Sequence, residues 1–233
     1  MTSRCACRGN ASELVEHTHM RTKIVGALRS FILLFTIGIG DSMADTINFD
    51  SYGPGPLPAD WVCGVTGSGG SRWTVEPDAD APSKPNILKQ SGVGDFPWCA
   101  RKSVSMADGY VEVKFKALSG RSDQAGGVIW RWKDGNNYYI ARANALENNV
   151  SLYHTTNGRR NTIKYVDAPV PKNTWHTLRV EFSGTSIKVS LNGKTYIDVQ
   201  DTRIAGAGAV GMWTKADSVT AFDDFTYAAA ASK

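Results

Sequence analysis

Apolar and polar residues alternate in short runs through most of the chain after position 45. Side chains of a strand point alternately to its two faces, so each run predicts a β-strand with one buried face. Asp134-Gly135-Asn136 and Asn192-Gly193 are turn signals that join neighbouring runs as hairpins. The runs lie at 110–117, 127–133, 137–144, 150–154, 162–166, 175–182, 186–191, 195–199, 209–213 and 219–227.

The segment 52–98 has a different composition, rich in Gly, Pro, Ser and Asp. It predicts long surface loops with short strands at 73–75 and 86–89, preceded by a strand at 47–49. No long window has a helical period, and only 143–148 could form a turn of helix. About ten to twelve strands in one domain predict an all-β, antiparallel sandwich or barrel.

The stretch GGVIWRWKDGNNYYIARAN (126–144) raises the question of which aromatic side chains face the core. Alternation along this hairpin and the next strand divides the residues into two sets. The predicted core set is Val128, Trp130, Tyr139, Ala141, Val150 and Leu152. The predicted outward set is Arg131, Arg142, Asn144, Tyr138, Ser151 and Tyr153.

The outward set carries the candidate chemistry, because Arg, Asn and Tyr on neighbouring strands can bind polyhydroxylated or anionic ligands. The alternative is a solvated face with cross-strand pairs such as Arg131–Glu181.

The N-terminal segment 1–44 has the layout of an extension followed by a secretory signal peptide. Arg21, Lys23 and Arg29 precede the apolar run FILLFTIGIG, and Ser42 and Ala44 give a small-x-small cleavage pattern. The apolar run is shorter than a membrane span usually needs, and an uncleaved anchor is the alternative. We therefore expect a secreted or periplasmic domain at 45–228 and a disordered tail at 229–233.

Charge and cysteine content narrow the picture further. A net charge of +4 without a basic cluster argues against a nucleic-acid partner. Cys63 and Cys99 remain after the expected cleavage, and an exported chain with two cysteines favours one disulfide, with two free thiols as the alternative.

Three longer elements make the chain similar to known folds. GRSDQAGGVIWRWKDGNNYYIARANALENNVSLYHTTNGRR, NTWHTLRVEFSGTSIKVSLNGK and GAVGMWTKADSVTAFDDFTY resemble the concanavalin A-like, laminin G-like jelly rolls. More narrowly, the chain resembles the family named for 3-keto-disaccharide hydrolases over residues 49–227. The resemblance implies a two-sheet antiparallel jelly-roll sandwich whose concave face and bordering loops bind carbohydrate. It also adds residues beyond the parity argument to that face or its border, namely Trp213, Lys215, Asp217 and His176.

The residues do not support an ordinary glycosidase or esterase. Glu112, Glu147 and Glu181 stand alone, whereas glycosidases need two carboxylates close together. No Gly-x-Ser-x-Gly element appears, and only His154 and His176 follow position 44.

Cleavage of a 3-keto-glycoside requires fewer catalytic groups than ordinary glycoside hydrolysis, because the ketone acidifies the proton at C2 and a single base can start an elimination. Arg131, Arg142 or Lys215 could stabilise the enolate, and Asp123, Glu147, Asp217 or His154 could be the base. The candidate catalytic residues are Asp217, Arg142, Lys215 and Glu147. The candidate substrate-binding residues are Arg131, Tyr138, Asn144, Tyr153, Trp213, Gln124 and His176.

Asp50 and the Asp223-Asp224 pair suggest one structural Ca²⁺ that joins the first and last strands, with Asp50 and Asp224 as ligands. A carboxylate that caps loop amides is the alternative. The sequence therefore predicts an exported, monomeric, carbohydrate-active domain that cleaves 3-keto-glycosides. A non-catalytic glycan-binding module, with exposed rings such as Tyr138 and Trp213, is the main alternative, and an envelope interaction domain without a sugar ligand is a third.

Overall fold

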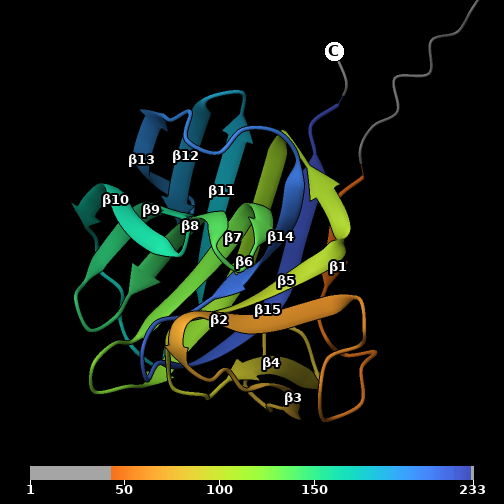
Figure 1. Cartoon of the computed structure of the whole chain (residues 1–233). Helices are drawn as coiled ribbons and strands as arrows, with labels where there is room; N and C mark the ends of the chain where they lie inside the picture. The colour runs from red at the N-terminus through yellow and green to blue at the C-terminus, as the bar shows by residue number, and fades with distance from the viewer. Residues whose placement is uncertain (1–42, 232–233) are drawn as a thin grey trace, which may run out of the picture. The chain divides into compact units, whose positions relative to one another are not determined.

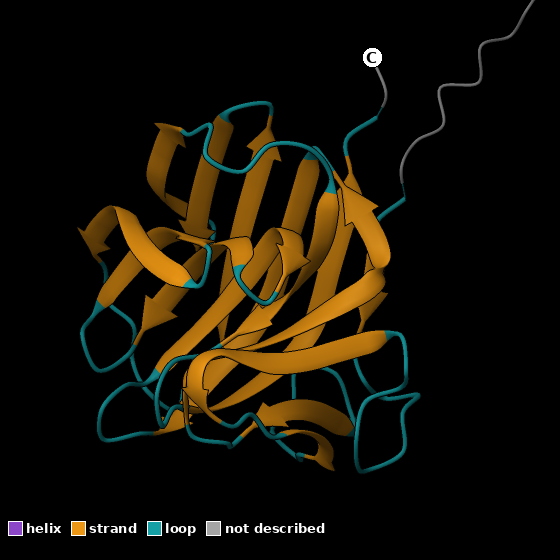
Figure 2. Ribbon diagram, in the orientation of Figure 1, coloured by secondary structure: helices purple, strands orange, loops and turns teal. Residues whose placement is uncertain are grey.

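The computed structural model describes residues 43–231, and all fifteen regular elements in that part are β-strands (Figure 2). They form two antiparallel sheets, which we call the front and back sheets as they appear in Figure 1. The front sheet has the order β10-β9-β8-β7-β14-β5-β2, and the back sheet has the order β13-β12-β11-β6-β15-β4-β3, with β1 paired to β15. The predicted all-β, two-sheet architecture is confirmed.

The strand bounds agree closely with the alternating runs after position 109. The front sheet contains β2 (Trp61–Gly69), β5 (Gly94–Met106), β7 (Ala125–Asp134), β8 (Asn137–Asn144), β9 (Asn149–Thr156), β10 (Arg159–Asp167) and β14 (Gly208–Trp213). The back sheet contains β1 (Asp45–Ile47), β3 (Trp73–Pro77), β4 (Asn86–Gln90), β6 (Gly109–Ser119), β11 (His176–Ser183), β12 (Ser186–Leu191), β13 (Lys194–Gln200) and β15 (Val219–Ala229).

Two strands of the front sheet lie where surface loops were expected. β2 runs through the glycine-rich stretch 64–69, and β5 begins at Gly94, well before Cys99. Gly64 lies opposite Trp98 in the β2–β5 ladder, where a Cβ would be only 2.7 Å from the Trp98 ring. The glycine thus allows a close approach between two strands. Composition alone does not distinguish such a strand glycine from a glycine in a loop. The possible helical turn at 143–148 is also wrong, since β8 continues to Asn144 and non-helical turns follow.

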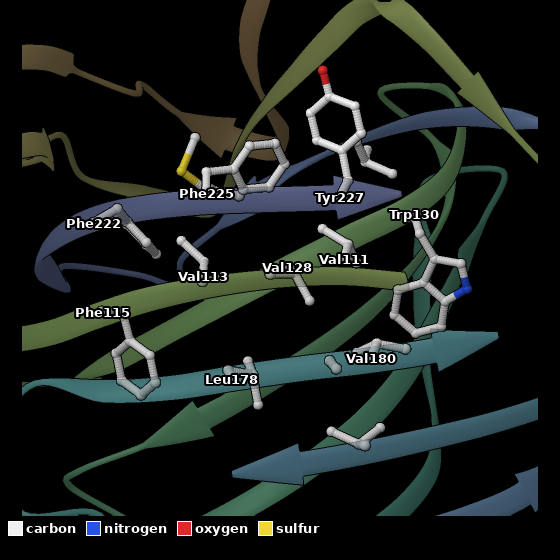
Figure 3. Packing of buried hydrophobic residues seen from close by; sticks show 14 of the residues in the cluster. Val111, Val113, Phe115, Val128, Trp130, Leu178, Val180, Phe222, Phe225 and Tyr227 are labelled. Carbon is white, nitrogen blue, oxygen red and sulfur yellow. The ribbon is translucent and has the colours of Figure 1, made fainter. Parts of the chain in front are cut away.

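The core between the sheets contains the predicted inward set. Val128, Trp130, Tyr139, Ala141, Val150 and Leu152 are all fully buried in it. Trp130 stacks on Tyr139 and on Phe182, with ring centroids 5.2 and 5.9 Å apart. Figure 3 shows Trp130 and Val128 of β7 beside side chains of the back-sheet strands β6, β11 and β15.

Arg131 is not on the outward face, and its predicted position is wrong. The β7–β8 register shifts between Trp130 and Asp134, and Arg131 has a positive φ of 46°, which marks a β-bulge. The bulge turns Arg131 inward, where its guanidinium donates to the carbonyls of Ala107, Ile204 and Gly184. Glu181 is not its partner, because that carboxylate pairs with Arg179 at 2.9 Å.

The outer face of the front sheet curls so strongly that distant strands touch. Thr66 of β2 shares a 2.6 Å hydrogen bond with the hydroxyl of Tyr138 of β8, although β5, β14 and β7 separate these strands in the sheet. Across the same face, the Arg160 guanidinium of β10 lies 4.6 Å from the Phe96 ring of β5. The curl makes this face a concave, partly closed surface.

The predicted disulfide is present between Cys63 and Cys99, which face each other in the β2–β5 ladder. Residues 1–42 of the predicted N-terminal extension and signal peptide lie outside the described residues. Within residues 43–231, no helix is long and apolar enough to cross a membrane. The domain boundary at 228 falls short, since β15 ends at Ala229 and the amide of Ala230 donates to Asp108.

Candidate functional site

One end of the concave face carries five polar residues that contact one another, which we call the polar cluster: Asp123, Arg142, Asn144, Glu147 and Lys215. The fully buried carboxylate of Asp123 is its centre. It accepts hydrogen bonds from Arg142 Nη1 at 3.3 Å to each oxygen, from Asn144 Nδ2 at 2.8 Å, and from Lys215 Nζ. Arg142 and Asn144 reach it because alternate residues of β8 share a face.

Asp123 is held in place by Asp217, in the connection between β14 and β15. The Asp217 carboxylate accepts the backbone amides of Arg121, Ser122 and Asp123 at 2.8, 3.0 and 3.1 Å. Burial acts to raise the pKa of Asp217, but these amides together hold it below its ordinary value. Both oxygens of Asp217 accept amides of this loop, so the carboxylate holds the backbone that carries Asp123.

Glu147 lies at the turn between β8 and β9, at the edge of the polar cluster, with 35% of its side chain exposed. Its Oε2 accepts from Arg142 Nη2 at 2.5 Å and from Asn149 Nδ2 at 2.8 Å. Burial acts to raise the pKa of Glu147, but Asn149, Arg142 and Lys215 outweigh it and lower the pKa. Glu147 is therefore an ionised carboxylate that a ligand can reach.

Two cations, Arg142 and Lys215, pair with two carboxylates, Asp123 and Glu147, within the polar cluster. Arg142 is only 2% exposed, and its buried Nε makes no hydrogen bond with the residues described. Such a site can stabilise negative charge that develops on a ligand oxygen, because buried cations act strongly where water is excluded.

The other part of the concave face is aromatic. Tyr138 and Trp213 are fully buried and Tyr153 is 4% exposed. Trp213 stacks against Phe96, with ring centroids 5.9 Å apart. The exposed rings that the glycan-binding alternative predicted at Tyr138 and Trp213 are thus absent from this structure, in which both rings are covered.

Several candidates lie away from the polar cluster. His176 is on the back sheet, where its ring nitrogens contact Pro171 O and Asn192 Nδ2. His154 is on β9 but is two residues from Leu152 of the core set, hence on the inward face, and its Nδ1 pairs with Thr156 at 2.9 Å. Gln124 borders the cluster and donates to Gly120 O at 2.9 Å. It also lines a pocket of about 410 Å³ with Arg121, Lys172 and Asp217.

The expected calcium ligands do not converge. Asp50 accepts the amide of Asn86 at 2.9 Å, and Asp224 pairs with Lys114 at 2.7 Å. Asp223 accepts from Ser83 at 2.8 and 2.9 Å. In residues 43–231, no group of three or more His, Cys, Asp or Glu side chains is placed to hold a metal ion. Asp50 and Asp223 therefore each accept a loop amide, whereas Asp224 forms an ion pair with Lys114.

Sequence reasoning did not include in its candidate set the following residues of this face: Thr66, Phe96, Asn149, Thr155 and Arg160. The parity that singled out Ser151 and Tyr153 also places Asn149 and Thr155 on the concave face. Arg160 lies directly opposite Thr155 in the β9–β10 ladder, so the same parity places it on this face. Phe96 is on β5, far from β8 and β9 in the chain and in the sheet order, and only the curl brings it in.

Comparison with known proteins identifies a family and similar folds. A sequence model described as the 3-keto-alpha-glucoside-1,2-lyase-like domain matches residues 67–226. No curated protein matches the chain.

Solved structures share the architecture. The carbohydrate-binding module CBM66 from Bacillus subtilis has a TM-score of 0.60 at 22% identity, covering 73% of this chain and 96% of that one. A Bacillus licheniformis β-glucanase has a TM-score of 0.52 at 15% identity, covering 82% and 99%. A Bacillus subtilis protein of unknown function with a galectin-like fold has a TM-score of 0.56 at 13% identity, covering 81% and 100%. At these identities the likeness shows the fold alone.

Proposed function

Since the chain belongs to the 3-keto-α-glucoside-1,2-lyase-like domain family, we propose that it cleaves 3-keto-glycosides at the polar cluster. Membership of this family supports the assignment of a carbohydrate-active domain. The observation that carries the proposal is the group formed by Glu147, Arg142 and Lys215 around buried Asp123. It offers one accessible carboxylate beside two cations, which is what an elimination next to a ketone requires.

In the first step, Glu147 accepts the proton from C2 of the sugar, and the C2–H electrons move into the C2–C3 bond as the ketone becomes an enolate. Lys215 and Arg142 stabilise the charge on the C3 oxygen. Lys215 has 25% of its side chain exposed and can contact a ligand directly. Arg142 has 3% of its side chain exposed and acts through its charge, from beneath the surface of the site.

In the second step, the enolate re-forms the ketone, a C1–C2 double bond forms, and the C1–O bond breaks. The departing oxygen takes a proton from solvent, and Glu147 releases the proton from C2 to solvent, which restores its carboxylate. Addition of water to C1 and C2 would then give the free 3-keto sugar, so the same elimination can serve a lyase or a hydrolase. Asp123, Asn144 and Asp217 hold the cations and the loop in place and are positioning residues.

The test is turnover of 3-keto disaccharides and of their unoxidised parents by the purified protein. We expect cleavage of the keto sugars alone, because only they have an acidified C2 proton. Glu147→Gln keeps the shape of the side chain but removes the base, and should lower kcat by roughly 10²–10⁴-fold. Lys215→Met should also lower kcat, measured at a temperature at which the variant is folded, because its Nζ is a partner of the buried Asp123 carboxylate and its loss lowers stability as well.

The matched control is Glu181→Gln, an exposed carboxylate of β11 on the back sheet that pairs with Arg179. It should turn over at the wild-type rate. Wild-type kcat in Glu147→Gln would exclude Glu147 as the base. Binding of both sugar sets without turnover of either would instead favour the non-catalytic glycan-binding module.

Export of the protein belongs to the same proposal. The segment before Met43 has a signal-peptide layout, and the Cys63–Cys99 disulfide is typical of chains that fold in an oxidising compartment. N-terminal sequencing of the chain from culture medium or periplasm should begin at Asp45. A protein retained in the cytosol with its N-terminus intact would contradict export.

A further inference from the structure

The phenol of Tyr165 stands beside the accessible carboxylate of the polar cluster. Tyr165 is on β10, directly opposite Ser151 of β9, so the two side chains share the concave face. It is 48% exposed, whereas Tyr138 and Tyr153 of the same face are buried. A ligand at this face can therefore reach the Tyr165 side chain but not the other two rings.

One side-chain amide joins Tyr165 to Glu147. Asn149 Nδ2 donates to Glu147 Oε2 at 2.8 Å and to the Tyr165 hydroxyl at 2.6 Å. The two hydrogens of a single amide nitrogen thus bridge the carboxylate and the phenol. Their oxygens are no farther apart than two hydrogen bonds, and both side chains are partly exposed. A base and a hydroxyl therefore border the same ligand position.

The orientation of this amide is fixed from the other side. Asn149 is fully buried, and its Oδ1 accepts from the Ser151 hydroxyl at 2.9 Å. The Nδ2 end therefore faces Glu147 and Tyr165. A hydroxyl that accepts from an amide keeps its own proton for donation. Within residues 43–231 the Tyr165 hydroxyl makes no other hydrogen bond, so this proton is free to go to a ligand.

The second step of the elimination needs a proton at the C1 oxygen. When the C1–O bond breaks, its electron pair stays on the departing oxygen, and a general acid that protonates this oxygen speeds the departure of an alcohol. The base acts at C2 and the acid acts on the substituent of the neighbouring carbon, C1. Glu147 and the Tyr165 hydroxyl, which share one amide nitrogen, have a spacing that suits this pair of tasks.

The two cations of the polar cluster are worse proton donors for this step. Lys215 Nζ pairs with the buried carboxylate of Asp123, and a Lys215 that lost its proton would leave that carboxylate without its partner charge. Arg142 carries a guanidinium, which does not give up a proton in proteins. The phenol of Tyr165 remains as the neutral, exposed donor next to the base.

We propose that Tyr165 is the general acid of the elimination and donates its phenolic proton to the oxygen that leaves C1. The Tyr165 O–H bond breaks as the O–H bond of the leaving alcohol forms, and the C1–O electron pair becomes a lone pair of that oxygen. The phenolate then takes a proton from solvent, so no further reactant is consumed. This role rests on the proposed function, and it replaces solvent as the source of the proton.

The test compares two 3-keto-α-glucosides that differ only in their leaving group. The methyl glycoside releases methanol, which needs a proton, whereas the 4-nitrophenyl glycoside releases a stable phenolate. Tyr165→Phe should lower kcat for the methyl glycoside by roughly 10²–10⁴-fold. It should leave kcat for the nitrophenyl glycoside at the wild-type value. Tyr196→Phe, a half-buried tyrosine of β13 on the back sheet, is the matched control and should behave as wild type with both.

A second measurement separates acid catalysis from a structural loss. In D₂O, Glu147 exchanges the C2 proton for deuterium whenever the enolate returns to the ketone before the C1–O bond breaks. Tyr165→Phe should therefore accumulate deuterium at C2 of uncleaved methyl 3-keto-α-glucoside, as measured by proton NMR against a sample without protein. Glu147→Gln should neither exchange this proton nor cleave the sugar.

The outcomes separate the role of Tyr165 from the elimination itself. An equal fall in kcat for both glycosides in Tyr165→Phe, or no fall for either, overturns the role of Tyr165 and leaves the elimination at Glu147 standing. Loss of C2 exchange together with cleavage in this variant also overturns it, because the base is then impaired. A wild-type protein that cleaves neither glycoside refutes the elimination, and the role of Tyr165 with it.

Discussion

Thr66 and Tyr138 meet across the concave face through a 2.6 Å hydrogen bond between their hydroxyls. The Thr66 hydroxyl also donates to the carbonyl of Gly135 in the β7–β8 turn. Both residues are fully buried, so this contact fixes how far β2 curls over β8. The curl in turn encloses the aromatic half of the candidate site.

Thr66→Val should destabilise the protein by about 1–3 kcal/mol, because a valine of similar shape leaves the buried Tyr138 hydroxyl without this partner. Denaturant unfolding measures the change. Thr162→Val, at an exposed position of β10, is the control and should change stability by less than about 0.5 kcal/mol. Equal effects in the two variants would mean that Thr66 contributes nothing beyond its shape.

Arg131→Met tests the corrected position of Arg131. Its guanidinium donates to three carbonyls and pairs with Asp108 at 3.4 Å while only 4% exposed. Losing these bonds should cost about 1–3 kcal/mol in unfolding free energy, because carbonyl oxygens are left without their donor. KM for a 3-keto disaccharide should stay unchanged at a temperature at which the variant is folded. A raised KM with unchanged stability would restore Arg131 to the substrate site.

Asp223 should make stability depend on pH. Burial raises the pKa of Asp223 to about 6, against the hydrogen bonds from Ser83 and Asp224. A raised folded-state pKa means that the folded protein holds this proton more tightly than the unfolded chain. The resulting stabilisation is fully present below the ordinary value of 3.8, and is lost as pH rises through about 6.

Thermal unfolding from pH 4 to 8 therefore should show a contribution of about 2 kcal/mol or less that fades across this window, and Asp223→Asn should remove it. Asp198→Asn, an exposed partner of Lys188, is the control and should keep the wild-type pH profile. An Asp223→Asn profile that follows the wild type would show that another group is responsible.

The disulfide links β2 to β5 through Cys63 and Cys99, which are 36 residues apart in sequence. Its removal in Cys63→Ser/Cys99→Ser should lower the unfolding free energy by about 2–4 kcal/mol, because the unfolded chain regains freedom. A reducing agent should destabilise the wild type by a similar amount and leave the double variant unaffected. A reducing agent that also lowers the stability of the double variant would point to another cause.

The alternation of side chains predicted the strands after position 109 and the core positions of β7, β8 and β9. The prediction succeeded because one face of each strand is buried, so apolar residues recur at every second position. It failed at Arg131, since a β-bulge adds a residue without an obvious mark in the sequence. It also missed β2, because the glycines of this strand, which allow a close approach to Trp98, resemble those of a loop in composition.

The local sequence by itself determined the fold class, the inward set around Trp130 and the residue types of the polar cluster. Only the tertiary structure decided which of those residues meet. Asp123, Arg142 and Lys215 converge because loops from separate strands close on one end of the front sheet, and Arg160 reaches Phe96 because that sheet curls. Strand periodicity is a property of neighbouring residues, whereas curl and loop closure depend on packing between strands far apart in the chain, which no local pattern encodes.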